Sequence, residues 1–333
     1  MMRLKVDLAE NSYEILIKQG CLKQAAQELN LKRKVLIVTD SGIPKKYIDL
    51  ISKQCESPVI EIVPQGENSK SIDRFTNLCS TLIENNFTRT DAIIGLGGGV
   101  VGDLAGFVAA CYMRGIDFYN IPTTLLSQID SSVGGKTAIN MKQTKNIVGA
   151  FYQPKKVLID PDVLTTLSDR QKSSGIAEAI KMAATSNADF FNVLSEQDAW
   201  QNIEEVIVES LKIKIAVVEQ DEKESDLRKV LNFGHTIGHA IEANSAGKLQ
   251  HGECIALGML YFSSDEVKKK LESVLRKYSL PTETDLDQER IYKSILHDKK
   301  AAGDQITVVY VPTIGNFELI DMPLAELKSV MNK

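Results

Sequence analysis

Features that mark several classes of protein are missing from this sequence of 333 residues. Its five cysteines are odd in number, scattered and without a CxxC pair, which argues against a disulfide framework and a thiolate metal cluster. With 39 Lys and Arg against 44 Asp and Glu, the formal net charge is −5, and the basic footprint of a nucleic-acid-binding protein is lacking. We therefore expect a reducing, cytoplasmic location and no nucleic-acid partner.

Signals for secretion or membrane insertion are also missing. Residues 1–7 contain no apolar run of the kind found in signal peptides. The most suspicious stretch, 92–113, has a single charge at Asp103 but six glycines between 95 and 106, which a membrane-spanning helix would rarely contain. We interpret it as a buried strand, a glycine loop and a buried helix, and expect no contact with a membrane.

The first half of the chain alternates short β-branched runs with helical patterns. Strands are expected at 35–39, 59–63, 92–96 and 118–121, and a crossover helix at 71–85. This alternation predicts an α/β domain with a Rossmann-like, mostly parallel sheet over residues 1–168.

The pattern becomes helical in residues 169–333, which we expect to form a second, mostly α-helical domain. The expected helices are 173–186, 200–220, 232–244, 252–278 and 286–300. Residues 306–311 and 317–320 flank a turn and predict a small terminal hairpin.

A glycine-rich loop follows the predicted strand 92–96. Gly97, Gly99 and Gly102 have the GxGxxG spacing, which lets backbone amides approach a pyrophosphate at the start of a helix. The loop follows a later strand than in the usual dinucleotide fingerprint, since the first predicted strand ends at Asp40. A tight strand-to-helix turn is the alternative interpretation, although three consecutive glycines exceed what a turn requires.

Residues 130–137 end like a P-loop but do not complete one. The GxxxxGK[ST] pattern needs glycine where Asp130 stands, so ATP hydrolysis is not expected. Lys136 beside flexible backbone amides still predicts an anion pocket.

Histidine is scarce, and three of the four histidines fall within 17 positions: His235, His239 and His251. Asn232, His235 and His239 have the spacing i, i+3, i+7, which places them on one face of a helix. Glycines at 234, 238 and 252 let backbones come close together. This cluster predicts a site for a divalent, zinc-like metal ion.

A carboxylate is expected to complete the metal site. Glu178 is the best candidate, because it lies in a helical stretch of small and apolar residues where a solvated glutamate would be out of place, with Lys181 one turn on. Glu242 and Glu253 are alternatives that spacing does not exclude, and His297 in a charged helix is interpreted as a surface residue.

Taken together, these motifs resemble the 3-dehydroquinate synthase family. The resemblance is carried by residues 97–103, 114–116, 122–126, 130–137, 145–146, 151–154, 174–181, 221–222, Glu224, Arg228, 232–242, 251–253 and 298–300. It implies an N-terminal NAD-binding α/β domain, a C-terminal mostly helical metal-binding domain, and NAD with one divalent metal ion (Zn or Co) as cofactors.

The resemblance also implies roles for individual residues. The metal ligands are Glu178, His235 and His251, while His239 is a catalytic neighbour rather than a ligand. The catalytic set is Lys136, Lys181, Glu224, Asn232 and His239. The NAD-binding set is Asp40, Glu67, Lys70, Gly98, Gly99, Val100, Asp103, Thr123, Thr124, Lys136, Lys145 and Thr166. The substrate-binding set is Arg114, Asp130, Lys136, Asn146, Lys214, Arg228, and Lys299 or Lys300, with a homodimer in which Arg114 is contributed by the neighbouring subunit.

The activity implied by the resemblance is the conversion of 3-deoxy-D-arabino-heptulosonate 7-phosphate to 3-dehydroquinate and phosphate, in the shikimate pathway of aromatic amino acid biosynthesis. It proceeds by transient oxidation by NAD, phosphate elimination, re-reduction and an intramolecular aldol reaction.

Three other functions remain open at the level of sequence. A metal-dependent polyol dehydrogenase shares the glycine loop but typically binds metal through Asp, His and His. A related sugar phosphate cyclase would alter the groups that recognise the substrate carboxylate, whereas Lys214 and Arg228 are present here. A sensor of NAD or a phosphosugar would not need the metal ligands and Lys181 together.

Overall fold

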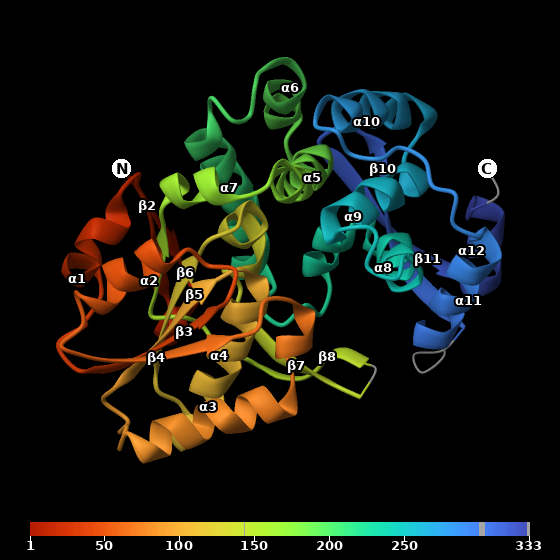
Figure 1. Ribbon diagram of the computed structural model, residues 1–333. Coiled ribbons are helices and arrows are strands. Elements are labelled where there is room, and N and C mark those ends of the chain that lie inside the picture. The colour runs from red at the N-terminus through yellow and green to blue at the C-terminus, as the bar shows by residue number, and fades with distance from the viewer. Residues whose placement is uncertain (143, 300–303, 332–333) are drawn as a thin grey trace. The chain divides into compact units, whose positions relative to one another are not determined.

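The computed structural model describes residues 1–142, 144–299 and 304–331, with the backbone alone for 297–299. The chain forms two compact units, Met1–Leu167 and Ser168–Lys333 (Figure 1).

Unit 1 is built on a seven-stranded sheet of order β1-β2-β9-β6-β5-β3-β4. All neighbouring pairs are parallel except β1 with β2. The strands are β1 (Met2–Val6), β2 (Tyr13–Ile17), β3 (Lys34–Asp40), β4 (Ser57–Val63), β5 (Ala92–Gly97), β6 (Asp117–Pro122) and β9 (Lys156–Ile159). The four strands expected from β-branched runs are confirmed as β3, β4, β5 and β6, but β1 and β2 precede them, so β3 is not the first strand of the sheet.

Strand β3 marks the point where the order of the sheet reverses. From β3 the chain passes through helix α2 (Lys45–Ser52) to β4 on one side, and β5 then lies on the other side. In parallel α/β sheets, ligands bind at the carboxyl ends of the strands that flank such a point. The carboxyl ends of β3 and β5 are therefore the expected ligand site of unit 1.

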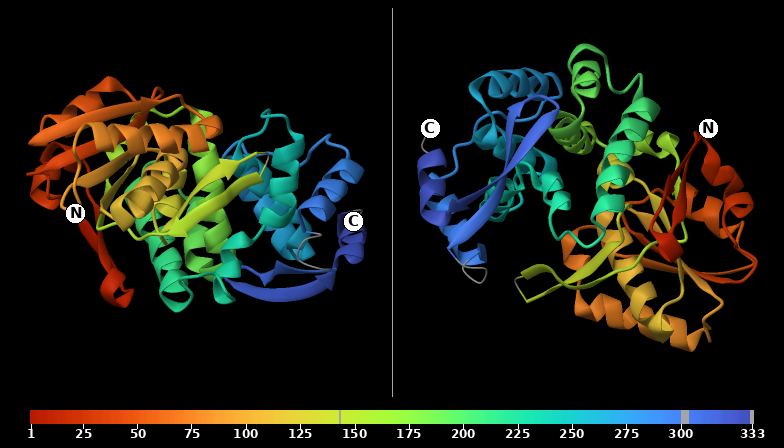
Figure 2. Two further views of the ribbon diagram at one scale, coloured as in Figure 1. Left: turned by 90° about the horizontal axis from the view of Figure 1, so that it is seen from below. Right: turned by 180° about the vertical axis from the view of Figure 1, so that it is seen from behind.

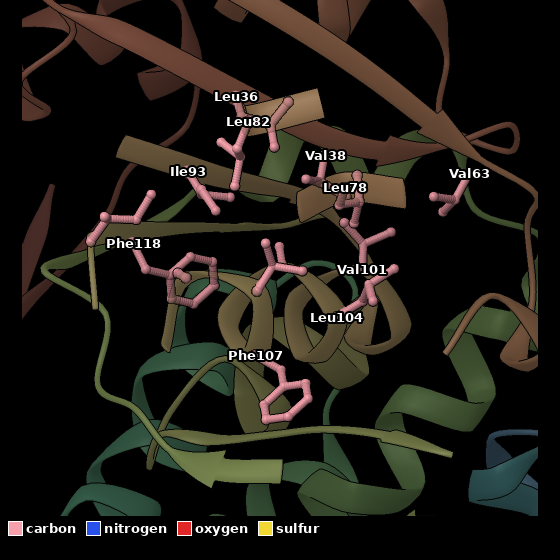
Figure 3. Packing of buried hydrophobic residues seen from close by; sticks show 14 of the residues in the cluster. Leu36, Val38, Val63, Leu78, Leu82, Ile93, Val101, Leu104, Phe107 and Phe118 are labelled. Carbon is pink, nitrogen blue, oxygen red and sulfur yellow. The ribbon is translucent and has the colours of Figure 1, made fainter. Parts of the chain in front are cut away.

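Helices α3 (Ile72–Glu84) and α4 (Gly99–Cys111) cover one face of this sheet. Figure 3 shows Leu36, Ile93 and Phe118 of the sheet facing the side chains of both helices. Alternate residues of β3 are buried on the opposite face, which explains its continuous apolar run. Helix α1 (Ala25–Glu28) is a single turn, and the crossover helix expected at 71–85 is confirmed as α3.

A two-stranded hairpin, β7 (Lys136–Met141) and β8 (Thr144–Phe151), was not expected from the sequence. Its inner side packs on α4 through Ile139, Val148 and Ala150. Most of β8 is exposed, so the strand has little apolar periodicity by which it could be recognised. Figure 2 shows this hairpin projecting from unit 1.

Unit 2 consists mainly of helices. They are α5 (Asp169–Ser186), α6 (Ala188–Glu196), α7 (Ile203–Gln220), α8 (His235–Asn244), α9 (His251–Met259), α10 (Asp265–Lys277), α11 (Gln288–Lys299) and α12 (Leu324–Met331). The expected terminal hairpin is confirmed as β10 (Gln305–Thr313) and β11 (Asn316–Pro323). Gly315 in its turn donates its backbone N–H to the carbonyl oxygen of Ala184 in α5.

Two helix predictions in unit 2 are wrong. Asn232 ends a short 3₁₀ helix and does not share α8 with His235, because Phe233 is extended and Gly234 is left-handed at φ +77°. The helix expected at 252–278 is two helices, since the chain extends at Ser263 and Ser264 then caps α10 by accepting the N–H of Val267.

Within residues 1–142, 144–299 and 304–331, no helix is both long enough and apolar enough to cross a bilayer.

Candidate active site

Three helices of unit 2 carry the expected metal ligands. Glu178 lies in the middle of α5, and His235 and His251 are the first residues of α8 and α9. Helix α5 begins with a capping box formed by Ser168 and Gln171, which fixes where the helix starts.

Glycines let these helices come into backbone contact. A Cβ atom at Gly252 of α9 would lie 2.0 Å from the carbonyl oxygen of Ser174 in α5. A Cβ at Gly258 would lie 1.9 Å from the carbonyl oxygen of Gly234, next to α8. No side chain fits at either position, so these glycines allow the close approach that brings the three ligand-bearing segments together.

The side chains of the cluster meet at short distances. Glu178 Oε1 lies 3.5 Å from His251 Nε2 and 3.9 Å from His235 Nε2. One ring nitrogen from each of His235, His239 and His251 lies within 4.8 Å of the other two. Three imidazoles and one carboxylate therefore face a volume in which a divalent ion could be bound.

In two of the histidines, the ring nitrogen Nδ1 contacts an oxygen atom. His235 Nδ1 lies 3.1 Å from the carbonyl oxygen of Phe233, and His251 Nδ1 lies 3.0 Å from Glu242 Oε2. Glu242 thus meets His251 on the side away from Glu178.

Glu253, the other carboxylate considered from the sequence, has a structural role. It accepts hydrogen bonds from Nε and Nη2 of Arg170, both at 2.6 Å, and from the backbone N–H of Gln250 at 2.7 Å. These bonds cap α9 and tie it to α5, so Glu253 supports the cluster without facing it.

Lys181 and Glu178 form a buried ion pair. Lys181 Nζ lies 2.5 Å from Glu178 Oε2, and the two side chains are 2% and 0% exposed. Burial alone would raise the pKa of Glu178, but the Lys181 ammonium, together with His251 and His235, holds it well below its usual range. Burial and the charge of Lys181 lower the pKa of His235 well below its usual range.

The protonation states of Glu178 and His235 suit metal binding, because a ligand must present an ionised carboxylate or a neutral imidazole. Burial would lower the pKa of His251, but Glu178 and Glu242 raise it to about 9, so this ring must lose a proton when it binds a metal. Neither oxygen of Glu178 accepts a hydrogen bond of normal geometry from the described residues, although Lys181 is close to one of them. Among the described residues, Oε1 meets only the rings of His235 and His251, at 3.9 and 3.5 Å, and a divalent ion would supply the close partner that a buried oxygen requires. The residues of the cluster therefore fit a divalent metal.

Residues 221–232, which precede α8, include further candidate site residues. The Asp221 carboxylate accepts the backbone N–H groups of Ser225, Asp226 and Arg228 at 2.8, 2.8 and 3.0 Å, and these bonds hold its pKa far below the usual range. The loop so closed carries Glu224 at φ +60°. Asn232 Nδ2 donates to Glu224 Oε1 at 2.9 Å, which joins two members of the expected catalytic set.

Two expected substrate-binding cations of unit 2 are buried. Arg228 is 2% exposed and donates from Nη1 to the carbonyl oxygen of Glu222, and Lys214 of α7 is 5% exposed. His239, by contrast, is exposed on α8. The backbone of Lys299 ends α11 while its side chain is not described, and Lys300 lies outside the described residues.

Most of the expected NAD-binding residues of unit 1 lie at or after the carboxyl ends of its parallel strands. Asp40 ends β3, Glu67 and Lys70 follow β4, Gly98 to Val100 and Asp103 follow β5, Thr123 and Thr124 follow β6, and Thr166 ends the 3₁₀ helix after β9. One edge of the sheet thus carries residues that are far apart in the sequence, at the position expected for a ligand of this fold.

The glycine loop leaves little room for side chains. Gly98 caps α4, and Cβ atoms at Gly98 and Gly99 would lie 3.3 Å from Thr124 Cγ2 and 3.0 Å from Ser131 Oγ. Backbone amides at the start of α4 can then approach an anion. The P-loop-like segment is different, because Lys136 begins strand β7 where a P-loop would begin a helix.

Lys70 contacts two other expected binding residues of unit 1, Asp103 and Asn146. It is 4% exposed, its Nζ lies 2.6 Å from Asp103 Oδ2, and it donates to Asn146 Oδ1. Asn140, which the sequence did not single out, donates to Glu67 Oε1 at 2.8 Å and accepts the N–H of Asn146. No local signal marks Asn140, because its role arises only where the hairpin meets the sheet edge.

The remaining candidates of unit 1 are more accessible. Lys136, Lys145 and Asn146 are exposed on the hairpin, and Asp130 is half-buried in a π-helix, Ser127–Ser131. Arg114 is exposed in a strained segment, with φ +69° at Arg114 and +50° at Met113. Such strain in residues other than glycine is typical of functional positions.

Comparisons with known proteins agree with this arrangement. Residues 60–174 match the family model "3-dehydroquinate synthase N-terminal" and residues 175–301 match "3-dehydroquinate synthase C-terminal". A curated 3-dehydroquinate synthase of Enterococcus faecalis is 42% identical over 100% of this chain and 99% of its own length.

Solved structures share the fold. A 2-deoxy-scyllo-inosose synthase complexed with carbaglucose-6-phosphate, NAD⁺ and Co²⁺ has a TM-score of 0.90 at 24% identity, covering 99% of each chain. A 2-epi-5-epi-valiolone synthase from Streptomyces hygroscopicus, with NAD⁺ and Zn²⁺ bound, has a TM-score of 0.87 at 22% identity, covering 98% of this chain and 97% of that one. With both family domains matched in order and 42% identity over its whole length, the chain belongs to the 3-dehydroquinate synthase family.

Proposed function

We propose that this chain converts 3-deoxy-D-arabino-heptulosonate 7-phosphate to 3-dehydroquinate and phosphate, using NAD and a divalent metal ion. The observation that carries the proposal is the buried cluster in which Glu178 faces the Nε2 atoms of His235 and His251, with Lys181 beside it. These three ligand residues would hold the metal. A location in the cytoplasm accords with five cysteines that are all free.

When bound, NAD accepts and returns a hydride, and the metal ion polarises the substrate hydroxyl that is oxidised. The chain's own residues have the other tasks. Lys181 holds Glu178 ionised, and its ammonium can move a proton at the substrate hydroxyl. Asn232 is oriented by Glu224, so its amide oxygen can accept a hydrogen bond from a substrate hydroxyl, and His239 handles protons at its exposed ring.

The substrate carries a phosphate and a carboxylate, and the proposed binding residues are mostly cationic. In unit 2 these are the buried Arg228 and Lys214, with either Lys299, the last residue of α11, or Lys300, which lies outside the described residues. In unit 1 they are Lys136, with Asn146 and Asp130 as polar partners. A buried guanidinium suits a planar carboxylate, because it can donate two parallel hydrogen bonds.

The NAD site is proposed at the sheet edge of unit 1. The amides of Gly98, Gly99 and Val100 would receive the pyrophosphate at the start of α4. The other proposed NAD contacts are Asp40, Glu67, Lys70, Asp103, Thr123, Thr124, Lys136, Lys145 and Thr166.

The test is to incubate the purified protein with the heptulosonate phosphate, catalytic NAD⁺ and Zn²⁺ or Co²⁺, and to follow phosphate, dehydroquinate and NADH absorbance together. Phosphate and dehydroquinate should appear in equal amounts with no net NADH, whereas a polyol dehydrogenase would accumulate NADH. Lys181→Met should lower kcat by about 10²- to 10⁴-fold, while the surface variant Glu266→Gln should keep full activity. If no phosphate is released with either metal, the proposal is wrong.

We further propose a homodimer in which each Arg114 serves the neighbouring subunit. Within the described residues, the Arg114 side chain has no hydrogen-bond or ion-pair partner, and Met113, Ile147 and Phe151 of the same unit are exposed large apolar residues. A hybrid of one Arg114→Ala subunit and one His251→Ala subunit, isolated with two affinity tags, contains one site in which Arg114 and His251 are both intact. It should regain roughly half the activity of the unsubstituted dimer, whereas no recovery would mean that Arg114 acts within its own subunit.

A further inference from the structure

Glu242 lies behind a histidine of the metal cluster. Its Oε2 is 3.0 Å from His251 Nδ1, while His251 Nε2 on the other side of the ring is 3.5 Å from Glu178 Oε1. Glu242 follows His235 by seven residues on α8, about two helical turns, so the helix that carries one proposed ligand also carries the carboxylate that contacts another.

The hydrogen bond determines which nitrogen of His251 can bind a metal. A carboxylate accepts hydrogen bonds, so the neutral ring carries its proton on Nδ1 and has its lone pair on Nε2. That lone pair points to the side on which Glu178 and His235 lie. A half-turn of the ring would replace this lone pair with a C–H, and the opposite tautomer would replace it with an N–H.

His235 is held in the same way by a different group, the backbone carbonyl of Phe233. The carbonyl oxygen beside His235 belongs to the backbone and is present whatever side chain follows it. The partner of His251 is a side chain, which a substitution can remove. His251 is also the more accessible ring, 32% exposed against 13% for His235, so packing restrains it less.

We propose that Glu242 is a positioning residue, which sets the orientation and tautomer of His251 and thereby strengthens binding of the divalent metal. This inference rests on the proposed function, since it takes Glu178, His235 and His251 as the ligands. Glu242 contacts His251 rather than the metal or the substrate, so its effect on metal binding is exerted through the His251 ring. Removing a carboxylate that orients a histidine ligand typically weakens metal binding by about 10- to 100-fold.

The test measures the Zn²⁺ dissociation constant of the full chain by competition with a chromophoric chelator, at one pH and without substrate. Glu242→Ala should bind Zn²⁺ about 10- to 100-fold more weakly. Glu242→Gln should lie between this variant and the unsubstituted chain, because its amide oxygen can still accept the Nδ1 proton. Glu266→Gln, an exposed glutamate of the same unit, is the matched control and should bind normally.

A second measurement separates positioning from folding. The metal-free Glu242→Gln variant should still unfold in one cooperative thermal transition, while the visible spectrum of its Co²⁺ form changes. Unchanged Zn²⁺ affinity in Glu242→Ala, or an affinity of Glu242→Gln no better than that of Glu242→Ala, would overturn the inference.

The variant His251→Ala distinguishes failure of this inference from failure of the proposed metal site. If His251→Ala loses Zn²⁺ but Glu242→Ala does not, the metal site stands and the role of Glu242 is refuted. If both variants bind Zn²⁺ normally, the ligand set itself is wrong.

Discussion

Replacing Glu178 with leucine should destabilise the metal-free protein strongly, because it would leave the Lys181 ammonium buried without its carboxylate. The two side chains are 0% and 2% exposed, with 2.5 Å between Nζ and Oε2. Removing one partner of such a pair typically costs about 3 to 5 kcal/mol, since the remaining charge stays desolvated. For a domain of this size, each kcal/mol lowers the melting temperature by about 2 to 4 °C. We expect a decrease of about 6 to 20 °C.

The double variant makes this prediction specific. Lys181→Met should also destabilise the protein, because it strands the carboxylate. Glu178→Leu with Lys181→Met should recover most of the loss, since replacing a buried ion pair with apolar side chains is often neutral or stabilising. Calorimetry of the three variants and the unsubstituted chain, all in excess chelator, gives the coupling between the sites. If either single variant melts within about 1 °C of the unsubstituted chain, or if the two losses simply add, the buried pair does not contribute as described.

Three other perturbations follow from the structure. Gly252→Ala would place a Cβ 2.0 Å from the Ser174 carbonyl oxygen, so it should destabilise the protein by about 1 to 3 kcal/mol and weaken Zn²⁺ binding. A melting temperature and a Zn²⁺ affinity like those of the unsubstituted chain would contradict the backbone contact. Burial alone would lower the pKa of His251 from 6.5, but the two neighbouring carboxylates raise it to about 9. The associated stabilisation of the metal-free protein is complete below about pH 6.5 and is lost as the pH rises towards about 9. Zn²⁺ affinity should rise over the same pH range, because the ring must lose its proton to bind the metal. If the melting temperature of His251→Asn has the same pH profile as that of the unsubstituted chain, this assignment is refuted. Asp221→Ala should release the backbone that positions Arg228 and raise KM more than it lowers kcat, which steady-state kinetics can check, and an unchanged KM would show that the loop holds its shape without this carboxylate.

Much of the architecture of unit 1 was predictable because its signals are local. β-Branched runs predicted β3 to β6, and the glycines before α4 indicated a tight strand-to-helix junction. The hairpin β7–β8 was missed because one side of it packs on α4 while most of β8 remains exposed and leaves no apolar pattern. Asn232 was placed on the wrong helix because an i, i+3, i+7 spacing cannot reveal that Gly234 turns left-handed between them.

The sequence by itself determined the kinds of group that the candidate site contains: scarce histidines close together, a glutamate in an apolar helix, and glycines where helices meet. Only the tertiary structure decided what each carboxylate contacts. Glu178 faces the Nε2 atoms, Glu242 lies behind His251, and Glu253 pairs with Arg170. The physical reason is that a carboxylate's role depends on which atom it meets at about 3 Å, and that is set by the packing of α5, α8 and α9 against one another, which no spacing within one segment encodes.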